Sequence, residues 1–463
     1  MAIVGLIVAL AATTGIPGPA AVGAQVTADE PQYLLTAGAL YHHRDLDIGP
    51  DLRAETWRAY HRADLPTQTA VLPGGQRLSP HDPLLPMILA VPFGLGGWVG
   101  AKLAMALLAG VLAAVLVWTA VMRFRVPVGV AAMVVTAFGI VPPLIAYGTQ
   151  IYPELPAALA VAVAIAALTG PPGWRTTMVW VLAITALPWL AVKYTPVALA
   201  LVLVGMGVVV ASRRRDLLVG ALAALLVAAV GFGAFHQAVY GGWTVYAVGD
   251  HFAGGELTVM GTSPDYMGRS QRLLGLLTDR DFGLLAWAPA FLAALPAFGA
   301  LIRRRPPGWL ALGLPLGAGW LNATFVALTM HGWWWPGRQV VVVIPCIVLG
   351  VAWYLGTVVP AGHGSRLGSS LWSGWRLNLL VATTFGVMAW IGVQVAAAQG
   401  TSTVIVDLAD TTNAVTRAWR LLLPDLRVFG ALDVVRSMAW LLVFTVLAAW
   451  GWRTAQPEAP HDP

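Results

Sequence analysis

The sequence predicts an all-α integral membrane protein, a polytopic bundle of about twelve transmembrane helices, and three observations lead to this fold class. Only 10% of the 463 residues are charged and 58% are hydrophobic, whereas a soluble domain carries about 25% charged residues. Apolar runs of about 20 residues, the length that crosses a bilayer core of about 30 Å, recur along the whole chain. Arginines gather in alternate connections between these runs, which is the pattern of the positive-inside rule.

The apolar runs leave no room for a separate soluble domain, so we expect one membrane domain over residues 1–463. The first run is interrupted by Gly15-Ile16-Pro17-Gly18-Pro19 and has no basic residue before it. We therefore expect that a longer first helix begins upstream of Met1. The predicted spans lie at approximately 2–24, 98–122, 127–147, 153–170, 175–192, 195–211, 216–239, 283–302, 307–330, 339–359, 377–398 and 433–452.

The connections predict the orientation of the chain. The arginines of the short connections are Arg123, Arg125, Arg175, Arg213, Arg214, Arg215, Arg303, Arg304, Arg305, Arg366, Arg376 and Arg453. Their side is cytoplasmic by the positive-inside rule, and twelve spans then place both termini there. The long connections 25–97, 240–282 and 399–432 face outward and are the expected place for function. Within the first, 84–94 is apolar but too short to span, which predicts a helix lying at the membrane interface.

Composition and missing motifs exclude several classes of protein. Only Lys102 and Lys193 among 27 basic residues are lysine, a bias typical of a GC-rich bacterial genome and hence of a bacterial plasma membrane. The net charge of +6 reports topology and gives no reason to expect nucleic acid as a partner. No Walker A or His-Glu-x-x-His motif is present, and the single cysteine, Cys346, excludes a disulfide framework.

A metal site finds little support in the sequence. Asp250, His251 and Glu256, in the second long connection, have ligand chemistry suited to a divalent ion. Their spacing matches no metal motif, so a solvated loop is the favoured interpretation. The sequence identifies no certain cofactor, and a divalent metal stays an alternative without support.

An acidic pair, Asp29-Glu30, lies just beyond the first span on the outer side and is followed by Tyr33. A carboxylate at the membrane rim can act as a general base and take a proton from an acceptor hydroxyl. The same acids can cap a helix that begins at Pro31, because proline is favoured at the first helical position. The spacing weighs these two interpretations about equally.

Two further motifs place acids at the outer mouth of the membrane domain. Tyr152-Pro153-Glu154 opens the fourth span, where Glu154 in the first turn also complements the helix dipole. His81-Asp82 precedes the interfacial helix, and Asp82 is a strong N-cap candidate. Each acid thus has a structural interpretation beside the functional one.

The outer ends of the spans also carry candidate cations. The three tryptophans at 333–335 are typical of an interfacial aromatic belt, but Arg338 stands at the start of a long apolar helix. An arginine at this depth can bind a lipid phosphate through two hydrogen bonds. Lys193 and Lys102 are further candidates, and for all three the alternative is snorkelling to the interface.

In this order, the motifs resemble the GT-C superfamily of membrane glycosyltransferases, particularly protein O-mannosyltransferases and lipid A aminoarabinose transferases. The likeness covers the first seven spans well and the last five loosely, and the Asp-Glu pair is its most specific part. The matching residues are Asp29-Glu30-x-x-Tyr33, His81-Asp82-Pro83 with its interfacial helix, Tyr152-Pro153-Glu154, Asp281-Phe282-Gly283-Leu284-Leu285 and Gly337-Arg338.

The resemblance implies transfer of a sugar of the mannose or arabinose class from a polyprenyl-phosphate donor to a hydroxyl acceptor on the outer face. Asp29 would be the base of an inverting in-line displacement, and Glu154 would orient the acceptor or a sugar hydroxyl. A positive side chain would stabilise the departing phosphate, first Arg338, then Lys193 or Lys102. About ten residues follow the last span, which favours a lipid or cell-wall glycan over a protein as the acceptor. The expected site comprises Asp29, Glu30 and Glu154 as catalytic residues and Tyr33, His81, Asp82, Tyr152, Arg338, Lys193 and Lys102 as substrate-binding residues.

Two other functional classes remain open at this stage. A transporter or lipid flippase also has many helices, but the predicted spans contain almost no ionisable residue to couple to an ion gradient and no matched pair of broken helices. A catalytically silent relative that binds polyprenyl lipids would keep Asp29 and Glu30 as capping residues. A groove that joins Asp29, Glu154 and Arg338 would favour the transferase.

Overall fold

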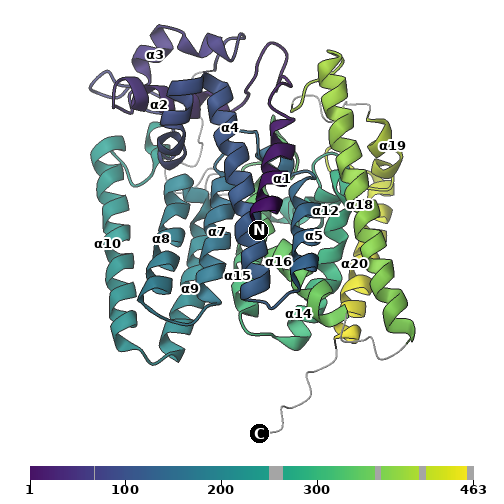
Figure 1. Cartoon of the computed structure of the whole chain (residues 1–463). Helices are drawn as coiled ribbons and strands as arrows, with labels where there is room; N and C mark the ends of the chain where they lie inside the picture. Colours follow the sequence, from purple (N-terminus) through teal and green to yellow (C-terminus); the bar gives the residue numbers. More distant parts are fainter. Residues whose placement is uncertain (67, 250–263, 360–365, 406–412, 456–463) are drawn as a thin grey trace.

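The computed structural model describes residues 1–66, 68–249, 264–359, 366–405 and 413–455, with the backbone alone for 366–373. Every regular element within these residues is helical, and most helices stand upright and side by side (Figure 1). Each of the twelve predicted runs overlaps an α-helix of the described chain: α1 (Ala2–Thr13), α4 (Leu84–Met122), α5 (Val128–Gly139), α7 (Glu154–Leu168), α8 (Trp174–Leu190), α9 (Thr195–Ala211), α10 (Arg215–Tyr240), α14 (Ala294–Arg304), α15 (Trp309–Leu321), α16 (Ile344–Trp353), α18 (Arg366–Ala398) and α20 (Ala431–Thr454).

Several predicted spans are shorter or more broken than their apolar runs. Seven stretches of the described chain are long and apolar enough to cross a membrane, while α1, α5 and α7 are shorter apolar helices. The run predicted at 2–24 is helical only to Thr13, because Pro17 and Pro19 lack the amide hydrogen that would continue the helix. The run at 283–302 divides into α13 (Leu284–Trp287), η5 (Pro289–Ala293) and α14.

The centre of the bundle is α16, together with the 3₁₀ turn η7 (Arg338–Val343) that precedes it. Of the most apolar window within Arg338–Val358, 94% is buried in the protein, against 11% for the corresponding windows of α10 and α20. A helix apolar on all sides is stable only if other apolar groups surround it. We conclude that α16 is enclosed by protein, whereas α10 and α20 leave most of their apolar surface for lipid.

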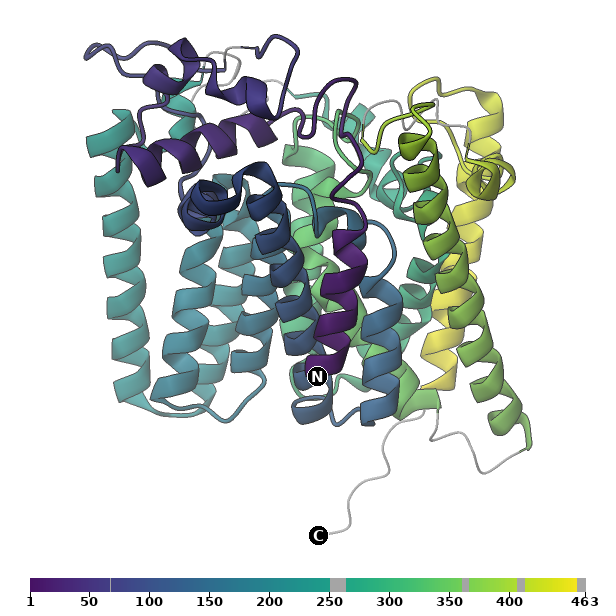
Figure 2. The ribbon, with the colours of Figure 1, turned by 45° about the horizontal axis from the view of Figure 1, so that its top comes forward.

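The predicted interfacial helix is present. At Gly97 (φ 58°, ψ −152°) α4 departs from helical geometry, which separates its first part from the upright part. A second helix, α2 (Glu30–His42), lies across the ends of the upright helices (Figure 2). The two pack so closely that a Cβ at Gly94 would lie 2.3 Å from ring atoms of Tyr41. These two helices cover one end of the bundle. We call this end the loop end.

The long connections contribute further short helices. The first also contains α3 (Gly49–Arg53) and η1 (Thr56–Ala59), the second η3 (Val245–Val248), α11 (Tyr266–Ser270) and α12 (Arg272–Thr278), and the third α19 (Ala414–Arg420). Asp250, His251 and Glu256 lie outside the described residues. The α9–α10 connection, with its three arginines, is at the end opposite α2 and α3 (Figure 1).

Candidate active site

A cluster of two acids and two cations forms at the loop end, around Arg338. The Nη2 atom of Arg338 donates to Asp29 Oδ2 over 2.8 Å, and its Nε donates to Glu154 Oε1 over 2.9 Å. Lys193 Nζ donates to the same Glu154 oxygen over 2.6 Å. The four residues come from four separate segments: the start of α2, the start of α7, the turn η2 (Val192–Tyr194) and η7. We call them the charged quartet.

Burial divides the charged quartet into an inner and an outer pair. The side chains of Glu154 and Arg338 are 0% and 7% exposed, whereas those of Asp29 and Lys193 are 24% and 25% exposed. Two carboxylates and two cations balance, as a buried charge cluster requires. Any reactant that reaches the quartet from solvent meets the Asp29 carboxylate and the Lys193 ammonium first.

The electrostatic surroundings keep Asp29 ionised. Burial alone would raise the pKa of this carboxyl, but the charge of Arg338, followed by those of His81 and Lys193, outweighs it and lowers the pKa to about 2. Asp29 occupies the N-cap position of α2, yet its side chain makes no capping hydrogen bond. Its carboxylate is thus oriented by Arg338 instead of by the helix that it precedes.

Aromatic rings enclose the guanidinium of Arg338. Its Cζ lies 4.1 Å from the ring centre of Tyr152 and 4.7 Å from that of Trp334, both within range of a cation–π interaction. The ring of Tyr33 lies 6.4 Å from that of Tyr152 and 4.7 Å from the imidazole of His81. Arginine stacked between rings and paired through two nitrogens is held in one orientation.

Glu30, the second acid of the predicted pair, faces a different set of partners. Its Oε1 accepts from the amide of Ile151 over 2.7 Å and its Oε2 from the amide of Thr27 over 2.8 Å. Burial raises the pKa of Glu30, and the charge of Lys102 and the two amides offset part of that effect. With both oxygens on backbone amides, Glu30 ties the segment before α2 to the segment before α7, and so sets Asp29 opposite Glu154.

Asp82 supports the segment that carries Lys193. Its Oδ2 accepts from the amide of Val192 over 3.0 Å, and its Oδ1 lies 3.4 Å from Nε2 of His236 on α10. The first part of α4 has Pro83 at its N-cap position, and no side chain caps it. Asp82 therefore does not have the capping role that its place before a proline indicates.

His81 and Lys102 are at the edge of this arrangement. Nε2 of His81 is 3.1 Å from Gln68 Oε1. Lys102 donates to the carbonyl of Gln25 over 2.7 Å and stands over the ring of Trp98. The hydrogen bond of Lys102 is thus with the segment that leads to Asp29, and not with the charged quartet.

Two residues of the site were missed by the sequence analysis. His236 is fully buried on α10, a helix with only four buried residues, and a lone histidine in an apolar run was the signal for it. Asn322 donates from Nδ2 to the carbonyl of Lys193 over 3.0 Å. It opens the π-helix η6 (Asn322–Val326), a feature that often marks a functional position. Among the described residues no group of three or more His, Cys, Asp or Glu side chains could hold a metal ion.

Comparison with known proteins defines the fold. No family model and no curated protein matches the sequence. ArnT from Cupriavidus metallidurans bound to undecaprenyl phosphate has a similar structure, with a TM-score of 0.54 and 15% identity over 98% of this chain and 77% of that one. The apo form of ArnT gives a TM-score of 0.49 at 15% identity, over 97% and 76% of the two chains. An apo oligosaccharyltransferase from Archaeoglobus fulgidus gives 0.46 at 12% identity, over 87% and 56%.

The fold is therefore similar to that of ArnT, as the sequence resemblance leads us to expect. The likeness to ArnT extends over 98% of this chain. An identity of 15% establishes this likeness for the fold alone, so the chemistry of the site has to be argued from its own residues.

Proposed function

We propose that this protein is a glycosyltransferase that moves a sugar from a polyprenyl-phosphate donor to a hydroxyl acceptor at the membrane surface. The observation that carries the proposal is the position of Arg338 between Asp29 and Glu154, with Lys193 beside them. An ionised base and two cations at one rim suit a reaction in which a hydroxyl loses its proton and a phosphate gains charge. The likeness to an ArnT structure that binds undecaprenyl phosphate supports a donor of this class.

In the proposed reaction Asp29 accepts the proton of the acceptor hydroxyl. The hydroxyl oxygen forms a bond to the anomeric carbon as the bond from that carbon to the phosphate oxygen breaks, which inverts the centre. The electron pair of the broken bond leaves with the polyprenyl phosphate, and Lys193 and Arg338 stabilise its charge. Glu154 holds both cations through one oxygen.

Arg338 also controls the basicity of Asp29, because it lowers the pKa of that carboxyl. A carboxylate with a pKa of about 2 is a weak base, so it gains a proton readily only when the hydroxyl becomes acidic in the transition state. A donor phosphate competes with Asp29 for Arg338, because phosphate is a strong partner for a guanidinium. Donor binding would then loosen the Arg338–Asp29 pair and make Asp29 more basic at the moment of reaction.

The orientation follows from the arginine distribution. With the arginine-rich connections in the cytoplasm, the loop end and the charged quartet face outward. Sugar nucleotides are cytosolic, so a lipid-linked donor fits an outward site. We favour a lipid or glycan acceptor and a sugar of the mannose or arabinose class.

Sugar transfer from defined donors tests this function. Membranes containing the protein would be given radiolabelled polyprenyl-phosphate mannose or arabinose, and labelled lipid and glycan products would be separated and counted. The proposal predicts label in a product with one of the two donors and none with the corresponding sugar nucleotides. Transport of the intact donor across the membrane without any transfer would contradict it and support a flippase.

A further inference from the structure

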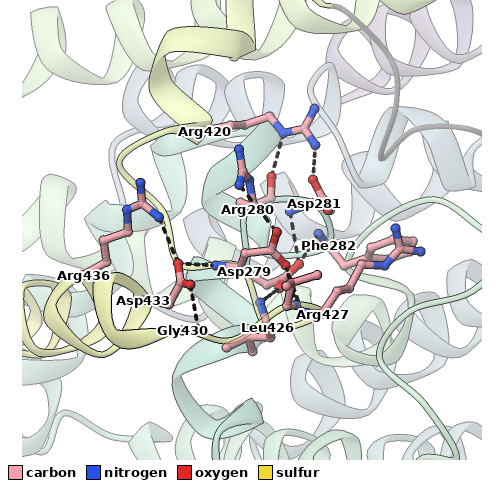
Figure 3. Close-up of polar contacts among 12 residues, drawn as sticks. Asp279, Arg280, Asp281, Phe282, Arg420, Leu426, Arg427, Gly430, Asp433 and Arg436 are labelled. Atoms are coloured by element: carbon pink, nitrogen blue, oxygen red, sulfur yellow. Dashed lines mark hydrogen bonds and ion pairs between the residues drawn. The ribbon is translucent and has the colours of Figure 1, made fainter.

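A buried turn after α12 is closed by one carboxylate. Asp279 is 1% exposed, and its Oδ1 accepts from the amides of Asp281 and Phe282 over 3.1 and 2.7 Å. Its Oδ2 accepts from the amide of Leu426 over 3.0 Å, which joins the turn to the segment before α20 (Figure 3). Three amides on one buried carboxylate fix the turn in a single conformation.

Helix α19 fixes the same turn from the other side. Arg420, buried in its last turn, donates from Nε to the carbonyl of Arg280 over 2.7 Å and pairs through Nη2 with the carboxylate of Asp281 (Figure 3). The neighbouring Trp419 donates from Nε1 to the carbonyl of Leu285 over 2.6 Å. At its start, α19 is tied to α18 by Asn413, whose Nδ2 donates to Ala389 over 2.8 Å.

The turn at 279–283 and the following helix α13 support the loop that leads to Arg338. The ring of Phe282 lies edge-on to that of His331, with ring centres 5.1 Å apart. Trp287, whose Nε1 donates to the carbonyl of Asp281 over 2.9 Å, contacts Trp335 with ring centres 5.1 Å apart.

The last point of support is Gly337, directly before Arg338. It has a positive φ of 84°, and a Cβ there would lie 2.6 Å from Leu284 of α13. Only glycine tolerates this conformation together with so close a neighbour. The loop before Arg338 is therefore supported at His331, Trp335 and Gly337 by the segment that Arg420 holds.

We propose that Arg420 is a positioning residue for Arg338. Arg420 fixes Asp281 and packs over Trp287, with its Cζ 5.5 Å from that ring, and Trp287 then supports Trp335 and the start of η7. If Arg420 is replaced, the segment from Asp281 to Trp287 can shift. A densely packed interior transmits such a shift to its neighbours because there is no free volume to absorb it. The effect on catalysis rests on the function proposed above, whereas the effect on the position of the loop does not.

A matched control is available within the same cluster. Arg436 also pairs with an aspartate, Asp433, over 2.9 Å (Figure 3). Asp433 lies on α20, three residues away from Arg436, and not on the 279–287 segment. Replacing either arginine by glutamine removes one charge and one ion pair, but only Arg420 contacts the support of the Arg338 loop.

Hydrogen–deuterium exchange of the purified full chain in detergent tests the structural claim. The amide of Val340 donates to Gly337 over 3.0 Å, so it reports on the start of η7. We expect peptides that cover 331–343 to exchange at least several-fold faster in Arg420→Gln than in wild type, and unchanged in Arg436→Gln. Faster exchange confined to 279–287 and 413–430 would overturn the proposal. If Arg420→Gln does not fold, Trp419→Phe removes the hydrogen bond to Leu285 and part of the ring that packs against Phe385 and Trp440. It is expected to show a smaller increase in the same peptides.

A double-mutant cycle with Arg338→Lys tests the catalytic claim. If Arg420 acts through Arg338, Arg420→Gln lowers kcat about tenfold or more alone and much less in the Arg338→Lys background. Additive losses would contradict this. The acid limb of the pH profile should also move to higher pH in Arg420→Gln, because Asp29 would keep only His81 and Lys193 as nearby cations. A wild type inactive with every donor would refute the proposed function, while the exchange result would still decide on the positioning.

Discussion

The guanidinium of Arg338 lies 2.8 Å from the carboxylate of Asp29, although 309 residues separate the two in the chain. The same guanidinium reaches Glu154 through Nε over 2.9 Å. One arginine thus connects the helix that lies across the loop end, the start of α7 and the buried helix α16. The proposed chemistry depends on this connection, and each of the following predictions changes one part of it.

Replacing Arg338 by lysine tests the need for a forked cation. Lysine keeps the charge but offers a point donor, so it cannot hold Asp29 and Glu154 in the present geometry. We expect kcat to fall about 100-fold, the effect of losing one preorganised donor to a developing charge, with the protein still folded. A transfer rate within twofold of wild type would show that the fork is not needed.

The two lysines should behave differently. Lys193 is a quarter exposed and belongs to the charged quartet, whereas Lys102 is buried and donates to the carbonyl of Gln25. We expect Lys193→Gln to raise the KM for the donor about tenfold, and Lys102→Gln to lower the melting temperature with little change in that KM. Initial rates over a donor titration, with a thermal melt of each variant, check this. A larger rise of KM in Lys102→Gln would reverse the assignment.

Glu30 should act on position instead of on proton transfer. Glutamine keeps one oxygen acceptor but leaves one of the amides of Thr27 and Ile151 without a partner, which costs about 1–3 kcal/mol. We expect Glu30→Gln to lower the melting temperature and to reduce kcat by much less than a change at Asp29. Equal losses of kcat at both positions would give Glu30 a direct part in the chemistry.

The Arg338–Asp29 pair should be visible in the pH dependence of stability. The ordinary pKa of an aspartate is about 3.9, and in the folded protein that of Asp29 is lowered to about 2. Because the folded-state pKa is depressed, the stabilisation is complete above about pH 4 and is lost as the pH falls towards 2. The difference in melting temperature between wild type and Asp29→Asn should therefore shrink over this range. A difference that stays constant down to pH 2.5 would show that Asp29 is not stabilised as an anion.

Hydrophobic patterning was enough to predict the helices, because an apolar run in lipid can pair its backbone N–H and C=O groups within one segment only by forming a helix. Patterning did not predict the helix ends where local backbone chemistry sets them. Pro17 and Pro19, for example, end the first helix earlier than its apolar run. The interfacial helix could be predicted because 84–94 is too short to span, but the break at Gly97 could not.

The candidate site was predictable only in part. Asp29, Glu154 and Arg338 could be placed at one depth from the ends of their spans, and the structure brings them into contact. Sequence could not show that Glu30 turns to the amides of Thr27 and Ile151, or that Asp82 meets His236. Those contacts depend on which helices become neighbours, and no local pattern encodes that choice.

The most direct test of the central claim is the transfer rate of Asp29→Asn. Asparagine keeps an oxygen that can accept from Arg338 but cannot take a proton from the acceptor. Asp64→Asn is the matched control, since Asp64 lies in the same connection with a fully exposed side chain. With the active donor, we predict that Asp29→Asn loses about 10²–10⁴-fold in kcat while Asp64→Asn equals wild type. Equal transfer by folded Asp29→Asn and wild type would contradict the role of Asp29 as the base.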